Sequence, residues 1–202
     1  MVRLNLIQLY LLSAIIATFT TVPVMASVMW DESIDGDLSG DYQNPTALIP
    51  IGVNNQVLYS SVSADREYFT FDVDEGDQLA AIIVDNWTST DDKSFLAVAA
   101  GNPFPTPPTS PGPNPAVMLG YHHFGVADVG LDILQIMGAG PGSQGFSGPL
   151  GAGTYTFWAQ ETGPNAAAAT LNFVITPISE PATGILLVGG LAMLTLGRRW
   201  AI

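Results

Sequence analysis

The sequence lacks cysteine entirely, and basic side chains and histidine are scarce. With no cysteine among 202 residues, disulfide frameworks, thiolate zinc sites and cysteine nucleophiles are excluded. Five basic residues stand against 18 acidic ones, for a formal net charge of −13, so the chain lacks the basic surface that a nucleic-acid-binding protein needs. The two histidines are adjacent, His122 and His123, and offer little for histidine-based catalysis.

The N-terminus has the three parts of a secretory signal peptide. Arg3 precedes an apolar run, and Val24-Met25-Ala26 places small or medium-sized residues before a cleavage point. We expect residues 1–26 to be removed after Ala26, because the apolar run is short for a membrane-spanning helix. An uncleaved N-terminal membrane anchor is the alternative.

The C-terminus ends in a second apolar segment. Residues 182–197 carry no charge, and Arg198-Arg199 follow them. At about 1.5 Å per residue such a helix would span roughly 24 Å, slightly less than the hydrocarbon core of a bilayer. The paired arginines predict that this end faces the cytoplasm. We therefore expect a short transmembrane helix, with the body of the chain on the exported side.

The residues around this helix carry a resemblance to a known signal. Ser179-Glu180-Pro181, then the apolar run, then Arg198-Arg199 resemble the PEP-CTERM sorting signal, with Ser179 standing where that pattern has proline. The resemblance implies recognition by an exosortase, an integral-membrane cysteine protease-transpeptidase, and removal of the tail. It further implies anchoring in the inner membrane before processing, and a place at the cell surface or in the extracellular matrix afterwards. An ordinary tail anchor is the alternative.

Between these ends, residues 27–178 have the pattern of an all-β domain. Strict alternation in residues 66–73 places Phe69, Phe71 and Val73 on one face, as in a half-buried strand. Turns rich in glycine, asparagine and aspartate separate the runs. We expect a single antiparallel β-sandwich or jelly-roll-like domain. Its further strands are expected at residues 56–62, 78–85, 94–100, 154–160 and 169–176.

Three segments carry narrower expectations. Residues 80–84 are apolar on both faces, which favours a central strand. The proline-rich residues 102–115 predict an exposed extended loop, because proline cannot donate to a sheet ladder. Residues 128–137 fit a helix or a strand, and the pattern does not decide between them.

The body also resembles the bacterial pre-peptidase C-terminal type of domain. The resemblance implies an accessory β-sandwich that assists secretion, folding or surface attachment and has no catalytic residues of its own. Together with the tail, it leads us to expect a structural, adhesive or binding protein rather than an enzyme. The matching positions are Asp65, Glu67, Tyr68, Phe69, Gly76, Gly153 and Tyr155.

A cluster of acids near the start of the body suggests a weak calcium site. Alternate oxygen side chains, with Gly40 at position 6, match the first half of an EF-hand-like loop. Position 12 is Thr46 rather than the bidentate glutamate, so a solvated acidic turn is the alternative. No other cofactor is expected, and the acidic turn at residues 72–77 is a weaker candidate. The expected ligands are Asp35, Asp37, Ser39 and Asp41.

Two other functions stay open from the residues alone. Trp30, Trp87 and Trp158, with Asp85 and Asn86, could form a sugar-stacking surface, so a carbohydrate-binding module with extracellular polysaccharide as its partner is the first alternative. A secreted hydrolase comes second.

The motifs for such a hydrolase are poor. Ser143 lacks the glycine frame of a nucleophile elbow, and a triad would need His122 or His123 with Asp128 or Asp132. The GxGxxG pattern at residues 140–145 is followed by no helix-forming sequence, which a dinucleotide site requires.

Overall fold

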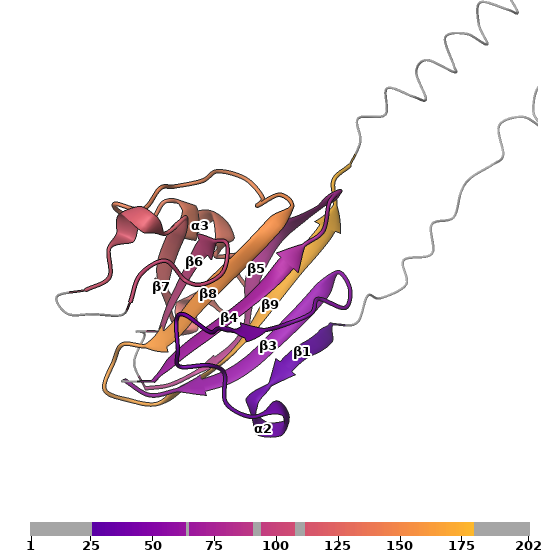
Figure 1. The fold of residues 1–202 in the computed structure, drawn as a ribbon. Helices are drawn as coiled ribbons and strands as arrows, with labels where there is room; N and C mark the ends of the chain where they lie inside the picture. Colours follow the sequence, from indigo (N-terminus) through magenta and orange to yellow (C-terminus); the bar gives the residue numbers. More distant parts are fainter. Residues whose placement is uncertain (1–25, 64, 91–93, 108–111, 180–202) are drawn as a thin grey trace, which may run out of the picture.

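The computed structural model describes residues 26–63, 65–90, 94–107 and 112–179. Within them, nine strands form two sheets, and short helical turns lie between the strands (Figure 1). The predicted signal peptide and the predicted helix over residues 182–197 lie outside these residues. No helix in the described part is long and apolar enough to cross a membrane.

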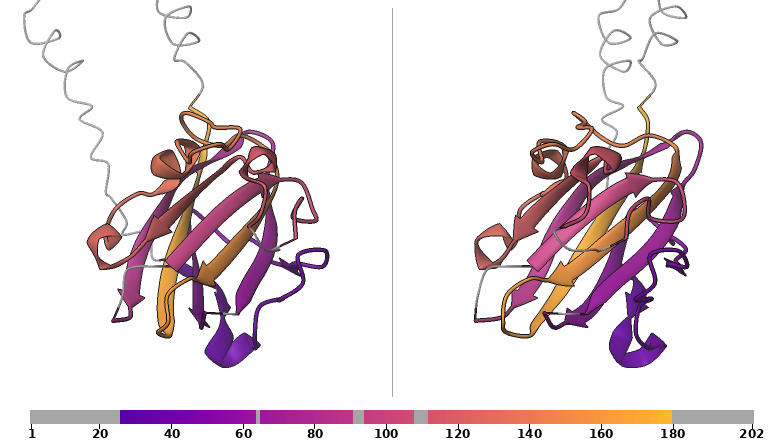
Figure 2. Two further views of the ribbon diagram at one scale, coloured as in Figure 1. Left: turned by 90° about the vertical axis from the view of Figure 1, so that its left-hand side faces the viewer. Right: turned by 60° about the vertical axis from the view of Figure 1, so that its left-hand side comes forward.

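The first sheet has the strand order β1-β3-β9-β5. β1 runs parallel to β3, and the other neighbours are antiparallel. The chain leaves β1 through the short helix α2 (Glu32–Asp35), which lies at one end of the strands in both views of Figure 2. The four strands are β1 (Ser27–Asp31), β3 (Asn54–Ser61), β5 (Asp77–Thr88) and β9 (Ala167–Pro177).

The second sheet has the order β2-β4-β8-β6-β7. β2 is parallel to β4, and the remaining pairs are antiparallel. Its strands are β2 (Thr46–Ala47), β4 (Arg66–Val73), β6 (Ser94–Ala100), β7 (Gly120–Phe124) and β8 (Gly153–Glu161). The turns η1 (Pro115–Val117) and η2 (Val126–Asp128) and the helix α3 (Leu134–Gly138) complete the described elements.

The two sheets share one apolar core. Phe173 on β9 lies 5.7 Å from Phe69, 5.3 Å from Phe71 and 5.0 Å from Phe157, between ring centroids. The three partners all belong to the second sheet. The inward face predicted for β4 is confirmed, since Phe69, Phe71 and Val73 are buried in this core. Two packed, mostly antiparallel sheets are consistent with the predicted sandwich.

A second apolar cluster covers the outer face of the second sheet. Tyr68 and Trp158 stack at 5.7 Å between ring centroids, and Phe104 and Met118 pack over them. Phe104 is only 1% exposed, so the expectation of an exposed extended loop at residues 102–115 is wrong at this position. The ring lies over the sheet because both faces of β4 and β8 carry apolar side chains there.

The prediction of a central strand at residues 80–84 is also wrong, because β5 is the last strand of its sheet. Its free edge is covered instead by chain segments that pair with it as isolated bridges, at Val129, Asp132 and Leu150. Within residues 128–137 the structure has the helix α3 and two isolated bridges but no strand, so the helical alternative holds for the second half of this segment.

The pairing of β1 with β3, and of β2 with β4, departs from a purely antiparallel sheet. The short strands β1, β2 and β7 were not expected from the sequence. β2 has two residues and β7 has five, too few for an alternating pattern to stand out.

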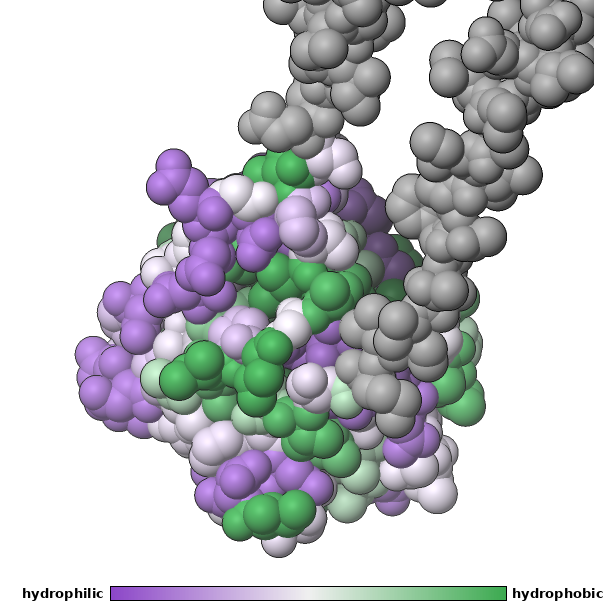
Figure 3. Space-filling view, turned by 90° about the vertical axis from the view of Figure 1, so that its right-hand side faces the viewer, coloured by the Kyte–Doolittle hydropathy of each residue, from purple (hydrophilic) through white to green (hydrophobic). Residues whose placement is uncertain are grey.

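One face of the molecule carries exposed apolar side chains among polar ones (Figure 3). The most exposed large apolar side chains of the described residues are Ile34 at 80%, Ile49 at 77% and Ile51 at 68%. Nothing in the described residues lies over them.

We expect Phe173→Ala to destabilise the fold strongly. The substitution removes the ring that packs against three rings of the opposite sheet, and such changes cost about 3–5 kcal/mol in a buried site. Val174→Ala is the matched control, because Val174 is the next residue of β9 and is only half-buried. Urea unfolding followed by far-UV circular dichroism measures both. A Phe173→Ala effect no larger than that of Val174→Ala would contradict this account of the core.

Candidate metal centre

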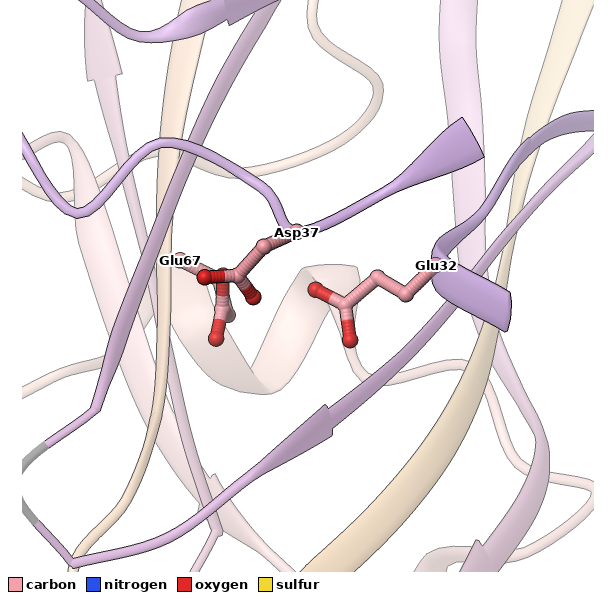
Figure 4. Close-up of side chains that lie close together, drawn as sticks. All are labelled: Glu32, Asp37 and Glu67. Carbon is pink, nitrogen blue, oxygen red and sulfur yellow. The ribbon is translucent and has the colours of Figure 1, made fainter. Parts of the chain in front are cut away.

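Three carboxylates meet where the chain passes from the first sheet to the second. Glu32 comes from α2, Asp37 from the crossing segment (residues 36–45) and Glu67 from β4. One oxygen of each lies within 4.8 Å of the others, and Figure 4 shows the three carboxylates turned toward one another. We call these three residues the acidic centre.

Glu32 is held in place by backbone groups from both sides. Asp31 caps the start of α2, since its carboxylate accepts from the Ser33 N–H at 3.0 Å. The Glu32 carboxylate then accepts from the Ser60 N–H on β3 at 2.7 Å and from the Leu38 N–H at 3.3 Å. This side chain therefore links the first sheet to the crossing segment.

Asp37 is placed by the residues that flank it. Gly36 ends α2 with φ of 93°, a conformation that side chains other than glycine rarely adopt. Leu38 is buried in the core, and the Ser39 carbonyl accepts from the Tyr68 N–H on β4 at 2.8 Å. Asp37 is thereby brought beside β4, while its own side chain stays exposed.

Glu67 is the buried member of the acidic centre. It is 0% exposed, and neither carboxylate oxygen receives a hydrogen bond that meets ordinary geometry from the described residues. The Asp65 carboxyl also reaches it, but two carboxyl groups share a hydrogen bond only when one of them holds a proton. A buried carboxylate in this position needs a proton or a cation.

Glu161 is a second buried acid at the same end of the core, and unlike Glu67 it has hydrogen-bond donors. It too is 0% exposed, yet its carboxylate accepts from the Ser94 hydroxyl at 2.9 Å and from the Gly163 N–H. Ser94 in turn accepts from the Trp87 indole N–H at 2.7 Å. The contrast makes the lack of donors at Glu67 specific to the acidic centre.

Burial and neighbouring charge shift the acid–base equilibria here. Burial foremost, together with charge repulsion from Glu32, Asp65 and Asp37, raises the pKa of Glu67 to about 9. Burial also raises the pKa of Glu32. Burial and the nearby Glu67, Glu161 and Glu32 raise the pKa of the Tyr59 hydroxyl, so Tyr59 remains a neutral phenol beside these acids.

The four residues of the sequence-predicted calcium loop do not all point to one site in the structure. Asp37 belongs to the acidic centre. Asp35 accepts from the Asp31 N–H at 2.9 Å, and the Ser39 hydroxyl bonds within its own turn. Asp41 accepts from the Gln43 N–H and the Asn44 amide; these bonds, that of Asn44 foremost, lower its pKa. Calcium at these four residues together stays a prediction.

The sequence analysis did not single out Glu32 or Glu67 as ligands. Glu67 had a recognisable signal, because it precedes Phe69 and Phe71 on the inward face of an alternating strand. A carboxylate in an inward position needs a partner. Glu32 had no such signal, since its approach to Glu67 depends on the crossing segment.

The candidate sugar-stacking residues do not form one surface. Trp87 is buried in the core between the sheets, and Trp158 is buried on the outer face of the second sheet. Trp30, on the edge strand β1, donates its indole N–H to the Gly36 carbonyl at 3.0 Å. Asp85 accepts from the Gln56 amide.

The candidate hydrolase residues also do not form one site, because each contacts different partners. His122 pairs with Asp128 at 3.5 Å, and the Ser143 hydroxyl donates to the Gly140 carbonyl at 2.7 Å. Asp132 accepts from the Ile82 and Leu134 N–H groups. No described helix follows residues 140–145, so the requirement for a dinucleotide site is not met.

The second acidic turn borders a surface pocket of about 460 Å³. Asp72, Asp74 and Asp77 lie at this pocket, with Ile49 and Ile175 among its apolar lining. Asp72 accepts from the Thr154 hydroxyl at 2.6 Å.

In comparisons with known proteins, no family model, no curated protein and no solved structure matches this chain.

We expect Glu67→Gln to stabilise the protein at neutral and alkaline pH when divalent cations are removed by a chelator. The raised pKa of Glu67 means that the folded state holds this proton more tightly than the unfolded state. Its contribution to stability is present below the usual pKa of 4.5 and is lost as pH rises toward about 9. Unfolding free energies measured from pH 5 to pH 9 should therefore fall less steeply in the variant.

Glu75→Gln is the matched control for the loss of one acid, because Glu75 lies in an exposed turn. It should follow the wild-type pH profile. A Glu67→Gln profile that also follows the wild type would mean that this carboxyl is not buried with a raised pKa.

Proposed function

We propose that this chain is an exported, non-enzymatic surface or extracellular-matrix protein, sorted and processed by an exosortase-type system. The observation that carries the proposal is the agreement of two boundaries. β1 begins at Ser27 and β9 ends at Pro177, next to the processing points inferred from Ala26 and Glu180-Pro181. The described residues within 27–177 contain both sheets and the apolar core between them, which supports a body that folds without the two ends.

The charge of the body supports the same proposal. Residues 27–179 hold 17 acidic and two basic residues, so no basic patch is available to hold an anionic membrane. Once the tail has been removed, nothing in the composition of the body favours retention at the membrane. The body resembles pre-peptidase C-terminal domains in its motifs, and we interpret it as a β-sandwich of that accessory type.

An enzymatic role has less support than a binding or structural role. A catalytic carboxylate pair must contact its substrate, whereas Glu67 is fully buried. His122 and Ser143 are engaged in separate local contacts, and the His123 ring packs against Phe95. A carbohydrate-binding module is also less well supported, because two of its three proposed tryptophans are buried in different clusters.

The sorting tail should determine location without help from the body. Residues 179–202 grafted onto a neutral exported reporter should be processed in a bacterium that has an exosortase. The same graft with Glu180→Ala and Pro181→Ala should stay in the membrane fraction at its unprocessed mass, because the recognised element is gone. Fractionation and intact-mass measurement follow both. Equal processing of the two grafts would make the tail an ordinary anchor.

The protein recovered from the surface of its own host should lack residues 1–26 and the apolar segment after Pro181. Intact-mass spectrometry checks both ends in one measurement, with total cell extract as the source of unprocessed precursor. Full-length mass in the surface fraction would contradict the export and sorting route.

A further inference from the structure

We propose that the acidic centre of Glu32, Asp37 and Glu67 is a calcium site that fastens the crossing segment to both sheets. The proposal does not depend on the export route and stands on the contacts of these three residues. Their ligand oxygens come from α2, from the crossing segment and from β4, and they lie within 4.8 Å of one another.

The state of Glu67 indicates a ligand and not a solvated acidic patch. Exposed carboxylates satisfy themselves with water, but both oxygens of Glu67 are shielded from solvent and accept no hydrogen bond of good geometry from the described residues. The Glu67 carboxyl group lies beside that of Asp37, and the Glu32 carboxyl group is turned toward both (Figure 4). A cation at this position would supply the partner that Glu161 obtains from Ser94 and Gly163.

The chemistry of the ligands favours calcium. All three are carboxylates, which bind hard cations, and together they offer up to six oxygens when each binds through both. Zinc prefers nitrogen and sulfur ligands. Magnesium requires a regular octahedron at about 2.0–2.1 Å and keeps most of its water, which suits a site with one fully buried ligand less well. The exposed Asp37 leaves a side open for the water that completes a calcium shell.

The positions of the ligands give the cation a mechanical role. Glu32 already bonds to Ser60 of β3 and to Leu38 of the crossing segment, while Glu67 belongs to β4. A cation between them therefore joins the edge of the first sheet to the second sheet near the N-terminal end of the chain. Without it, the buried Glu67 must hold a proton instead, and no ion bridges the three carboxyl groups at the point where the two layers meet.

The test measures the melting temperature of the full-length protein, purified in mild detergent, against free CaCl₂, MgCl₂ and ZnCl₂. With calcium, we expect a rise of about 3–5 °C for each tenfold increase in concentration above the dissociation constant. Glu67→Gln and Asp37→Asn should abolish the rise. Asp37 is exposed, so Asp37→Asn keeps the test valid even if the buried Glu67→Gln variant folds poorly.

Asp41→Asn is the matched control. Asp41 belongs to the sequence-predicted loop but not to the acidic centre, so this variant should keep the full calcium response. Loss of the response in Asp41→Asn with its retention in Glu67→Gln would overturn the proposal in favour of that loop. A melting temperature that calcium leaves unchanged, or that only zinc raises, would also overturn it.

Hydrogen exchange gives an independent readout of the mechanical role. Calcium should slow exchange in peptides that cover residues 32–45 and 58–62, which include the Leu38 and Ser60 amides bound to Glu32. Peptides from residues 120–140, on the opposite side of the second sheet, should exchange equally with calcium and with chelator. Uniform slowing across the whole chain would contradict a local fastening.

Discussion

The packing of Phe173 against three rings of the opposite sheet is the contact on which the two-layered structure depends. β9 lies between β3 and β5, so a ring projecting inward from it reaches the centre of the core. Phe69, Phe71 and Phe157 come from two neighbouring strands of the second sheet. Burial of these large apolar surfaces is the main favourable term in joining two sheets, and the other core residues extend the same layer.

This apolar packing ends in a polar region near α2. Tyr59, Glu67 and Glu161 are all buried in that part of the molecule, where the inward positions of β3, β4 and β8 are no longer apolar. A buried carboxylate is tolerated only with hydrogen-bond donors, a proton or a cation. Glu161 has donors. Glu67 has acidic neighbours instead, and this difference makes the end of the core sensitive to the ions around the protein.

Such sensitivity fits the location that we propose. A protein that folds after export meets a medium whose calcium content differs from that of the cytoplasm, and a site that depends on a cation becomes occupied only there. The buried Glu67 would hold a proton before export and exchange it for the cation afterwards. Folding and location would then be linked through a single centre, without disulfides, which this cysteine-free chain cannot form.

Six segments were correctly predicted to be strands because each has its own apolar pattern, such as the alternation of Phe69, Phe71 and Val73 on β4. β1, β2 and β7 were missed because short edge strands are decided by their neighbours and not by their own residues. The position of β5 was predicted wrongly for a related reason. Its free edge pairs with Val129 and Asp132, which lie far along the chain and have no signal in the strand itself.

The sequence by itself determined the all-β class, the inward rings and the acidic character of the body, because these follow from local periodicity and composition. Only the tertiary structure decided which acids meet. Asp37 is separated from Glu67 by thirty positions, and they come together because Ser39 pairs with Tyr68 and Leu38 enters the core. A cluster assembled from two sheets has no spacing rule in the chain, since its geometry depends on how the layers pack.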